Sequence, residues 1–285
     1  MSVGVRLDEK SSAACAVISW RDQVHIAWTG TDMRLNLASW PDGLELTGKQ
    51  RLAQRSYKQV RRSSSGPNQS ATSETVALPP SLAGSVEQLY MAWTGNNRAL
   101  NVLVANPDPH SAAVTLKQRS TESPSVTTSE RGDLILAWTG TDRHINLLTT
   151  DGDWSAAPVR LQEAKSDHAP ALCSRHGGPV LAWTGTDRHI NLLTVDGDWS
   201  AAPVRLEAKS DHAPAVCSHR GGPVLAWTGT DRHINLLTTG GDWSAAPVRL
   251  EAKSDYAPAV CSHHGSLILA WTGTDRRLNI GQPQS

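Results

Sequence analysis

The tetrapeptide Ala-Trp-Thr-Gly occurs six times along this chain, and this recurrence constrains the fold more than any other feature. The motif tryptophans are Trp28, Trp93, Trp138, Trp183, Trp227 and Trp271. They are separated by 65, 45, 45, 44 and 44 residues, and residues 165–206 differ from residues 209–250 at only five of 42 positions. A repeat with a period of about 44 residues is typical of proteins in which each structural unit packs against its neighbours.

Each repeat contains four short runs of β-branched and apolar residues. In the repeat around Trp183 we expect strands at residues 169–173, 180–184, 189–194 and 199–206. Turn-forming Gly, Pro and Asp residues separate these runs, as in antiparallel sheets. Four strands in about 44 residues is the pattern of one blade of a β-propeller.

The two ends of the chain complement each other. The last repeat ends after its third strand, at Asn279-Ile280, while residues 5–11 match residues 248–254 of the preceding repeat. An N-terminal strand would therefore complete the last blade and cover its open edge. The sequence predicts an all-β, six-bladed β-propeller with four antiparallel strands per blade, closed in this way, as a single domain over residues 1–285.

The 65-residue spacing contains an insertion at about residues 57–75. It includes Arg-Arg-Ser-Ser-Ser-Gly-Pro-Asn-Gln-Ser, which is polar, basic and rich in turn formers. Such composition predicts a mobile loop rather than a strand. It follows the fourth strand of the first blade.

Composition narrows the function classes. Lysine plus arginine and aspartate plus glutamate both number 27, so the formal net charge is zero. Proteins that bind nucleic acid through its phosphates are usually basic, so we expect no nucleic-acid partner. No apolar run reaches the roughly 18 residues of a membrane span, and residues 1–12 lack an apolar signal core. We expect a cytoplasmic protein without a membrane span, with export by an unconventional route as the alternative.

Three of the four cysteines recur at 44-residue intervals. The four are Cys15, Cys173, Cys217 and Cys261. Equivalent positions in different blades are too far apart for a disulfide, so we expect small buried thiols. Most of the eleven histidines recur once per blade at equivalent repeat positions, and no Cys-x-x-Cys or His-x-x-x-His pair occurs. We therefore predict no metal site and no cofactor.

Several recurring side chains are candidates for ligand binding. The motif tryptophans alternate onto an apolar face, which favours packing between blades over a role as stacking platforms for sugars. The aspartates after the motif are expected to close turns, with a ligand contact as the alternative. The candidate ligand-binding aspartates are Asp142, Asp187 and Asp231.

Two further sets lie next to predicted turns or strand starts. Trp154, Trp199 and Trp243 follow a turn, where a partly exposed ring can cover the C–H face of a sugar; packing at the blade edge is the alternative. His168, His212 and Tyr256 come just before the first strand of their blades, where ligand contacts are common.

The first two repeats break the symmetry. His25 and Tyr90 replace the Ile or Val found three residues before the tryptophan in the other repeats, and Glu87 lies near Tyr90. Such a group could perform general acid–base catalysis, and the insertion beside it could act as a lid. Simple divergence of two repeats is the competing interpretation.

Near-identical, tryptophan-rich blades with short turns resemble the tandem-repeat β-propeller lectins. That resemblance implies sugar sites between adjacent blades. The favoured hypothesis is a multivalent carbohydrate-binding protein, since repeated weak sites gain avidity. One alternative is an enzyme of the cyclase, lyase or hydrolase type, with a single pocket at the central channel using His25, Tyr90 and Glu87. Another is a protein-interaction scaffold.

Overall fold

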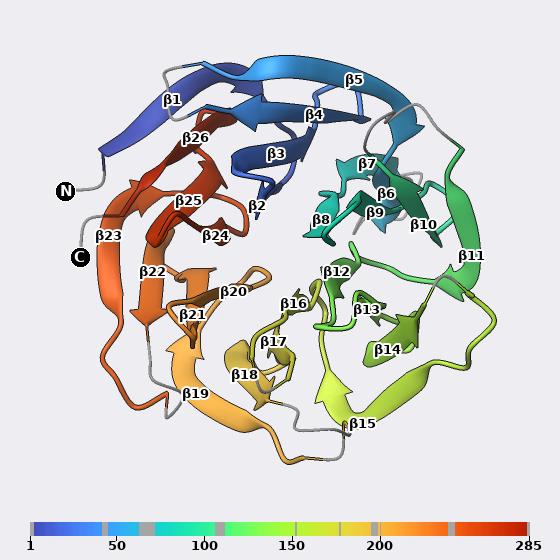
Figure 1. The fold of residues 1–285 in the computed structure, drawn as a ribbon. Coiled ribbons are helices and arrows are strands. Elements are labelled where there is room, and N and C mark those ends of the chain that lie inside the picture. Colours follow the sequence, from blue (N-terminus) through green and yellow to red (C-terminus); the bar gives the residue numbers. More distant parts are fainter. Residues whose placement is uncertain are drawn as a thin grey trace, which may run out of the picture.

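Alternating apolar side chains and tight turns arrange this chain as a ring of small sheets. A computed structural model describes residues 3–41, 45–62, 72–105, 112–151, 153–176, 178–194, 199, 201–238 and 243–283. Among these residues the strands form six four-stranded antiparallel sheets and one two-stranded sheet. The six sheets surround a central channel as the blades of a propeller (Figure 1). The predicted all-β, six-bladed fold is confirmed.

The first three blades follow one another along the chain. The first contains β2 (Cys15–Trp20), β3 (Gln23–Thr29), β4 (Arg34–Trp40) and β5 (Thr47–Arg55). The second contains β8 (Ser81–Gly84), β9 (Leu89–Thr94), β10 (Ala99–Val104) and β11 (Val114–Arg119). The third contains β12 (Ser125–Thr128), β13 (Leu134–Thr139), β14 (His144–Thr150) and β15 (Val159–Lys165).

The remaining three blades close the ring. The fourth contains β16 (Ala171–Cys173), β17 (Val180–Thr184), β18 (His189–Thr194) and β19 (Val204–Lys209). The fifth contains β20 (Ala215–His219), β21 (Gly222–Thr228), β22 (His233–Thr238) and β23 (Val248–Lys253). The sixth contains β24 (Ala259–His263), β25 (Ser266–Thr272), β26 (Arg277–Gln282) and the N-terminal β1 (Val3–Lys10).

The N-terminal strand closes the ring as the sequence predicts. β1 runs antiparallel to β26, with Val5 opposite Ile280 and Arg6 opposite Asn279. The strand brings Leu7 into the core between the sixth and first blades, where this side chain is 2% exposed. The first and last segments of the chain therefore lie side by side (Figure 1).

The innermost strand of each blade contacts the innermost strands of both neighbouring blades, so these strands line the channel. The motif tryptophan lies on the second strand and is at most 7% exposed in every blade. Trp183, for example, packs with Leu147 and Leu161 of the preceding blade. The six motif tryptophans thus fill the spaces between blades, which is the favoured interpretation of the sequence.

The insertion differs from its prediction. Residues 57–75 were expected to form a mobile loop, but β6 (Tyr57–Arg62) and β7 (Thr72–Ala77) pair as an antiparallel hairpin. The aromatic and β-branched residues Tyr57, Val60, Thr75 and Val76 favour strands, although most of the side chains in these segments are polar. Residues 63–71 lie outside the described residues.

The outer strand of the fourth blade also begins later than expected. We predicted a strand over residues 199–206, whereas β19 covers Val204–Lys209. Pro203, which precedes it, cannot donate a backbone hydrogen bond to a neighbouring strand. The residues before it therefore form the wall of a groove instead of extending the sheet.

All four cysteines are buried and free. Burial raises the pKa of Cys15, Cys173 and Cys261 to about 12, so these thiols stay protonated and inert. Within the described part of the chain, no helix is long and apolar enough to cross a membrane.

Candidate functional site

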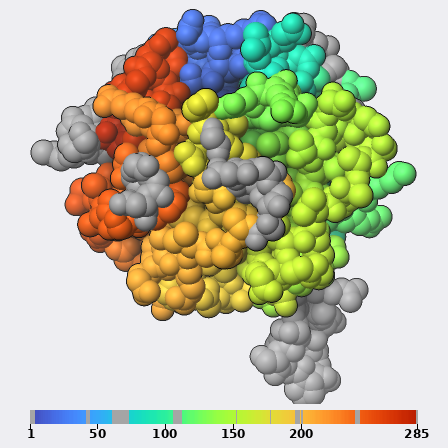
Figure 2. All heavy atoms as spheres, turned by 60° about the horizontal axis from the view of Figure 1, so that its bottom comes forward, coloured from blue at the N-terminus to red at the C-terminus, as the bar shows by residue number. Residues whose placement is uncertain are grey.

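A groove between the third and fourth blades is the largest cavity that we describe, with a volume of about 730 Å³. One wall is the outer strand β15, from Val159 to Ala164. The other wall contains Trp183, Leu193, Trp199 and residues 201–203. Residues of the third blade (yellow-green) and the fourth blade (yellow to orange) adjoin on the surface in Figure 2.

The groove combines aromatic and polar surface. Trp199 is half-buried and packs against the apolar cluster between the two blades, next to the motif residue Trp183. On β15, the Arg160 guanidinium donates hydrogen bonds to Asp142 Oδ2 (Nε–Oδ2 3.1 Å) and to Gln162 Oε1 (3.0 Å). These contacts fix the guanidinium next to Asp142, and Arg160 is one of the polar residues that β15 contributes to the lining of the groove.

The three turn-adjacent tryptophans all lie between blades but differ in exposure. Trp154 is half-buried against the cluster of the second and third blades. Trp199 lines the groove, whereas Trp243 is only 8% exposed between the fourth and fifth blades. The packing interpretation therefore describes Trp243, and Trp154 and Trp199 are the members of this set that a ligand could reach.

The three candidate aspartates hold turns together. Asp187 Oδ1 accepts a hydrogen bond from the His189 N–H (3.1 Å), and its Oδ2 accepts one from Arg205 Nε (3.0 Å). Asp142 and Asp231 make the equivalent contacts. Partial burial raises the pKa of these three carboxyls, but the hydrogen bonds together lower it by more. The pKa of each carboxyl is therefore below its usual value. Each remains about half exposed at the blade rim.

The residue two positions before each of these aspartates must be glycine, because there is no room for a side chain. A Cβ at Gly185 would lie 2.7 Å from Asp187 Oδ1 and 2.9 Å from Asn191 Nδ2. Asn191 in turn donates to the His189 carbonyl (3.0 Å). The Thr-Gly-Thr-Asp motif and the asparagine that follows it thus form one hydrogen-bonded unit, which any side chain at the glycine would displace.

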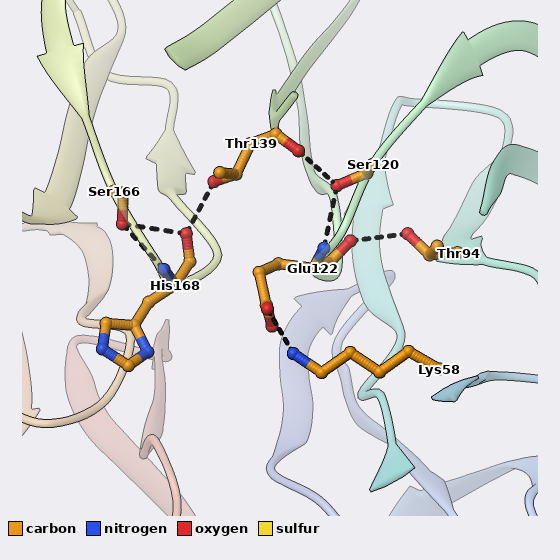
Figure 3. Close-up of polar contacts among 7 residues, drawn as sticks. All are labelled: Lys58, Thr94, Ser120, Glu122, Thr139, Ser166 and His168. Atoms are coloured by element: carbon orange, nitrogen blue, oxygen red, sulfur yellow. Dashed lines mark hydrogen bonds and ion pairs between the residues drawn. The ribbon is translucent and has the colours of Figure 1, made fainter. Parts of the chain in front are cut away.

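A second cavity, of about 430 Å³, lies at one mouth of the central channel. His168, His212 and Tyr256 all line it, so the structure brings this predicted set together. Glu122 occupies the equivalent position in the third blade, and Lys58 of the hairpin β6–β7 forms an ion pair with it (Figure 3). Burial raises the pKa of Glu122 even though Lys58 opposes that rise.

Hydrogen bonds between blades fix the backbone around this mouth. Thr139 Oγ1 donates to the His168 carbonyl (2.6 Å), and Ser166 Oγ donates to the Thr184 carbonyl (2.7 Å) of the next motif (Figure 3 shows the first of these). Every motif threonine makes the equivalent bond to the following blade. These links were not predicted from the sequence, although the linked serine and threonine recur 18 or 19 residues apart in five of the six blades.

No hydrogen bond joins His25, Tyr90 and Glu87 to one another in the described part of the chain. His25 stands opposite Ile18, near the far end of the channel, and contacts Trp20 and Ser39. Tyr90 donates its hydroxyl to Gln88, and the Glu87 carbonyl accepts a hydrogen bond from Arg21. None of the three lines the groove, the mouth cavity or the channel. The described residues also contain no group of three or more side chains suited to a metal ion.

Lys58, Glu122, Ser123 and Arg160 are site residues that sequence reasoning missed. Aligning the repeats places Glu122 at the position of His168, which was an available signal. Lys58 carried no such signal, because its contact with Glu122 depends on how the hairpin folds back toward the channel.

Comparison with known proteins supports the architecture alone. No family model and no curated protein matches the sequence. Among solved structures, SapL1 lectin in complex with α-methyl fucoside superposes with a TM-score of 0.64 at 11% identity, covering 97% of this chain and 94% of its own. A fungal lectin from Aleuria aurantia, described as a six-bladed β-propeller that recognises fucose, gives 0.63 at 11% identity, covering 98% and 95%. The WD40 propeller of Doa1 gives 0.54 at 13% identity, covering 100% and 97%.

Proposed function

We propose that this protein binds carbohydrate in the grooves between its blades, at more than one site per chain. The observation that carries the proposal is the groove of the third and fourth blades, whose lining combines Trp199 and Trp183 on one wall with the polar residues Arg160, Gln162 and Glu163 on the other. Sugars present an apolar C–H face and a polar rim, and this pairing of surfaces suits both.

Repetition of the chain supports several such sites. The segment Trp-Ser-Ala-Ala-Pro-Val-Arg-Leu occurs three times, starting at Trp154, Trp199 and Trp243. The groove of the third and fourth blades draws on two of these copies: Trp199 of the second copy lines one wall, and Arg160 of the first copy lies on the outer strand that forms the other. Weak sites at a fixed separation gain apparent affinity on a surface that displays many sugars.

The neighbouring structures add a fold-level argument. Two of the proteins that superpose on this chain are lectins that recognise fucose or its methyl glycoside. Since identity is 11% in both cases, fucose is a first probe for this protein and other neutral sugars are equally open to test.

The test is a glycan array followed by calorimetry of the full chain with methyl α-L-fucoside and with the strongest neutral glycan of the array. We expect saturable binding of at least one neutral sugar at two or more sites per chain. Trp199→Ala should lower the number of sites by one and leave the affinity of the remaining sites unchanged, because each groove is a separate structure.

Trp20→Ala is the matched control, since Trp20 is a half-buried tryptophan outside the described groove. It should leave the number of sites unchanged. An array without any bound glycan, or a Trp199→Ala protein that binds as many sugars as the unchanged chain, would contradict the proposal.

A further inference from the structure

The mouth of the channel differs from the grooves because it occurs once per chain. Each blade contributes one residue at the same position of the repeat, namely Ala13, Leu78, Glu122, His168, His212 and Tyr256, whose carbonyl groups accept the threonine bonds described above. In this ring the small or apolar Ala13 and Leu78 are neighbours on one side. The four polar side chains occupy the other side. A symmetric backbone thus carries one asymmetric cavity.

Most charged groups around the cavity are already paired. Glu122 pairs with Lys58, and Asp255 pairs with Arg232 (Nη2–Oδ1 2.6 Å). Glu74, the remaining acid of the lining, also has an interaction within the chain.

Arg276 is the exception. In the three preceding blades the equivalent arginine pairs with an aspartate of the next connection: Arg143 with Asp167, Arg188 with Asp211, and Arg232 with Asp255. At the ring closure this aspartate is replaced by Ser12, and Arg276 has no acidic partner among the residues that the structure describes. The cavity therefore presents one positive charge that the protein itself leaves uncompensated.

Ser123 provides an independent indication of a ligand. This residue is 3% exposed and lines both the cavity and the channel. Its Oγ has no hydrogen-bond partner in the described part of the chain. A buried hydroxyl without a partner is destabilising, and a hydrogen bond to a bound hydroxyl or carboxylate oxygen would offset that cost.

His168 and His212 add neutral donors and acceptors to the same wall. Burial lowers the pKa of both imidazoles, so near neutral pH each ring offers one N–H donor and one nitrogen acceptor. Such groups suit hydroxyls, which also donate and accept. The cavity volume of about 430 Å³ is in the range of sites for small molecules.

We propose that the channel mouth binds one small hydroxylated carboxylate per chain. The Arg276 guanidinium pairs with the carboxylate, and His168, His212 and Ser123 bind its hydroxyls. The ligand is either a free sugar acid or the uronic acid residue of a glycan, since both carry this chemistry. This site is separate from the grooves proposed above for neutral sugars.

The experiment is calorimetry of the full chain with D-gluconate, with methyl β-D-glucuronide and, for comparison, with the uncharged methyl β-D-glucoside. We expect one site per chain for at least one of the two acids and no binding of the glucoside at that site. Preference for gluconate identifies a free acid, and preference for the glucuronide identifies a glycan residue. Absence of binding by both acids overturns the proposal.

Two variants connect the binding to this cavity. Arg276→Gln should weaken binding by about tenfold or more, because it removes a charge-assisted pair. Arg98→Gln is the matched control: Arg98 occupies the same repeat position with a similar backbone (φ 66° against 64°) but does not line the cavity. Equal loss in both variants, or none in Arg276→Gln, would show that the acid binds elsewhere.

Ser123→Ala should weaken acid binding several-fold while the unfolding midpoint stays the same or rises, since a hydroxyl without a protein partner is removed. Unchanged acid binding in this variant would remove Ser123 from the site. Trp199→Ala should leave acid binding unchanged, so failure of the groove proposal and failure of this one produce different results.

Discussion

At the scale of single residues, short polar side chains organise the connections between blades. The motif threonine of one blade donates a hydrogen bond to the connection that leads into the next blade. A serine of that connection donates a hydrogen bond to the motif threonine carbonyl of the next blade, and both side chains are buried in every copy. Buried hydroxyls of this kind are stabilising only when paired, and here each has a backbone carbonyl in reach. The same links place the side chains that surround the channel mouth.

Two tryptophans at the same repeat position should differ in their contribution to stability. Trp243→Ala should lower the free energy of unfolding by about 3–5 kcal/mol, because the ring fills the space between the fourth and fifth blades. Trp199→Ala should cost only about 1–2 kcal/mol, since that ring is half-buried. Urea unfolding of both variants measures the difference, and equal losses would contradict the assignment of Trp199 as the accessible ring.

At the scale of elements, the ring depends on a strand from the opposite end of the chain. β1 supplies hydrogen bonds to β26 and places Leu7 in the core. It also passes close to the last motif tryptophan, because a Cβ at Gly4 would lie 2.5 Å from Trp271 Cη2. Without β1, both β26 and this tryptophan would be open to water or to another chain.

Deletion of residues 1–10 should therefore lower the free energy of unfolding by several kcal/mol, from the loss of Val5, Leu7 and the strand pairing. We also expect association of chains through the exposed edge of β26. Thermal unfolding and light scattering after gel filtration measure the two effects. Deletion of residues 1–2 alone is the control, and a ten-residue truncation that unfolds like this control would show that β1 does not close the ring.

At the scale of the whole molecule, buried histidines link stability to pH. Burial lowers the pKa of His25, His168 and His212 below the ordinary value of 6.5. The unfolded chain then binds protons more readily than the folded protein, so the stability is fully present above pH 6.5 and is lost as the pH falls toward the folded pKa values. Glu122 acts in the opposite sense, because its raised pKa favours proton uptake by the folded state.

We expect the urea midpoint to fall as the pH is lowered from 7.5 to 5. The double variant His168→Gln/His212→Gln should show a shallower fall, since two of the contributing groups no longer titrate. A second loss should begin below about pH 4, because the aspartates of the unfolded chain take up protons there while the turn aspartates of the folded protein, whose pKa values are lowered from 3.8, stay ionised. Identical pH profiles of the unchanged chain and the double variant would contradict the role of these histidines.

The sequence alone determined the number of blades, their strand order and the closure by residues 5–11, because repeat spacing and alternation are properties of the chain itself. It also predicted that His168, His212 and Tyr256 would occupy equivalent positions. Tertiary structure decided which candidates are accessible: Trp199 and Trp243 have nearly the same local sequence, yet only the second is fully buried. It likewise brought Lys58 to Glu122, across 64 residues, because that contact follows from the path of the hairpin in space and not from any periodic pattern.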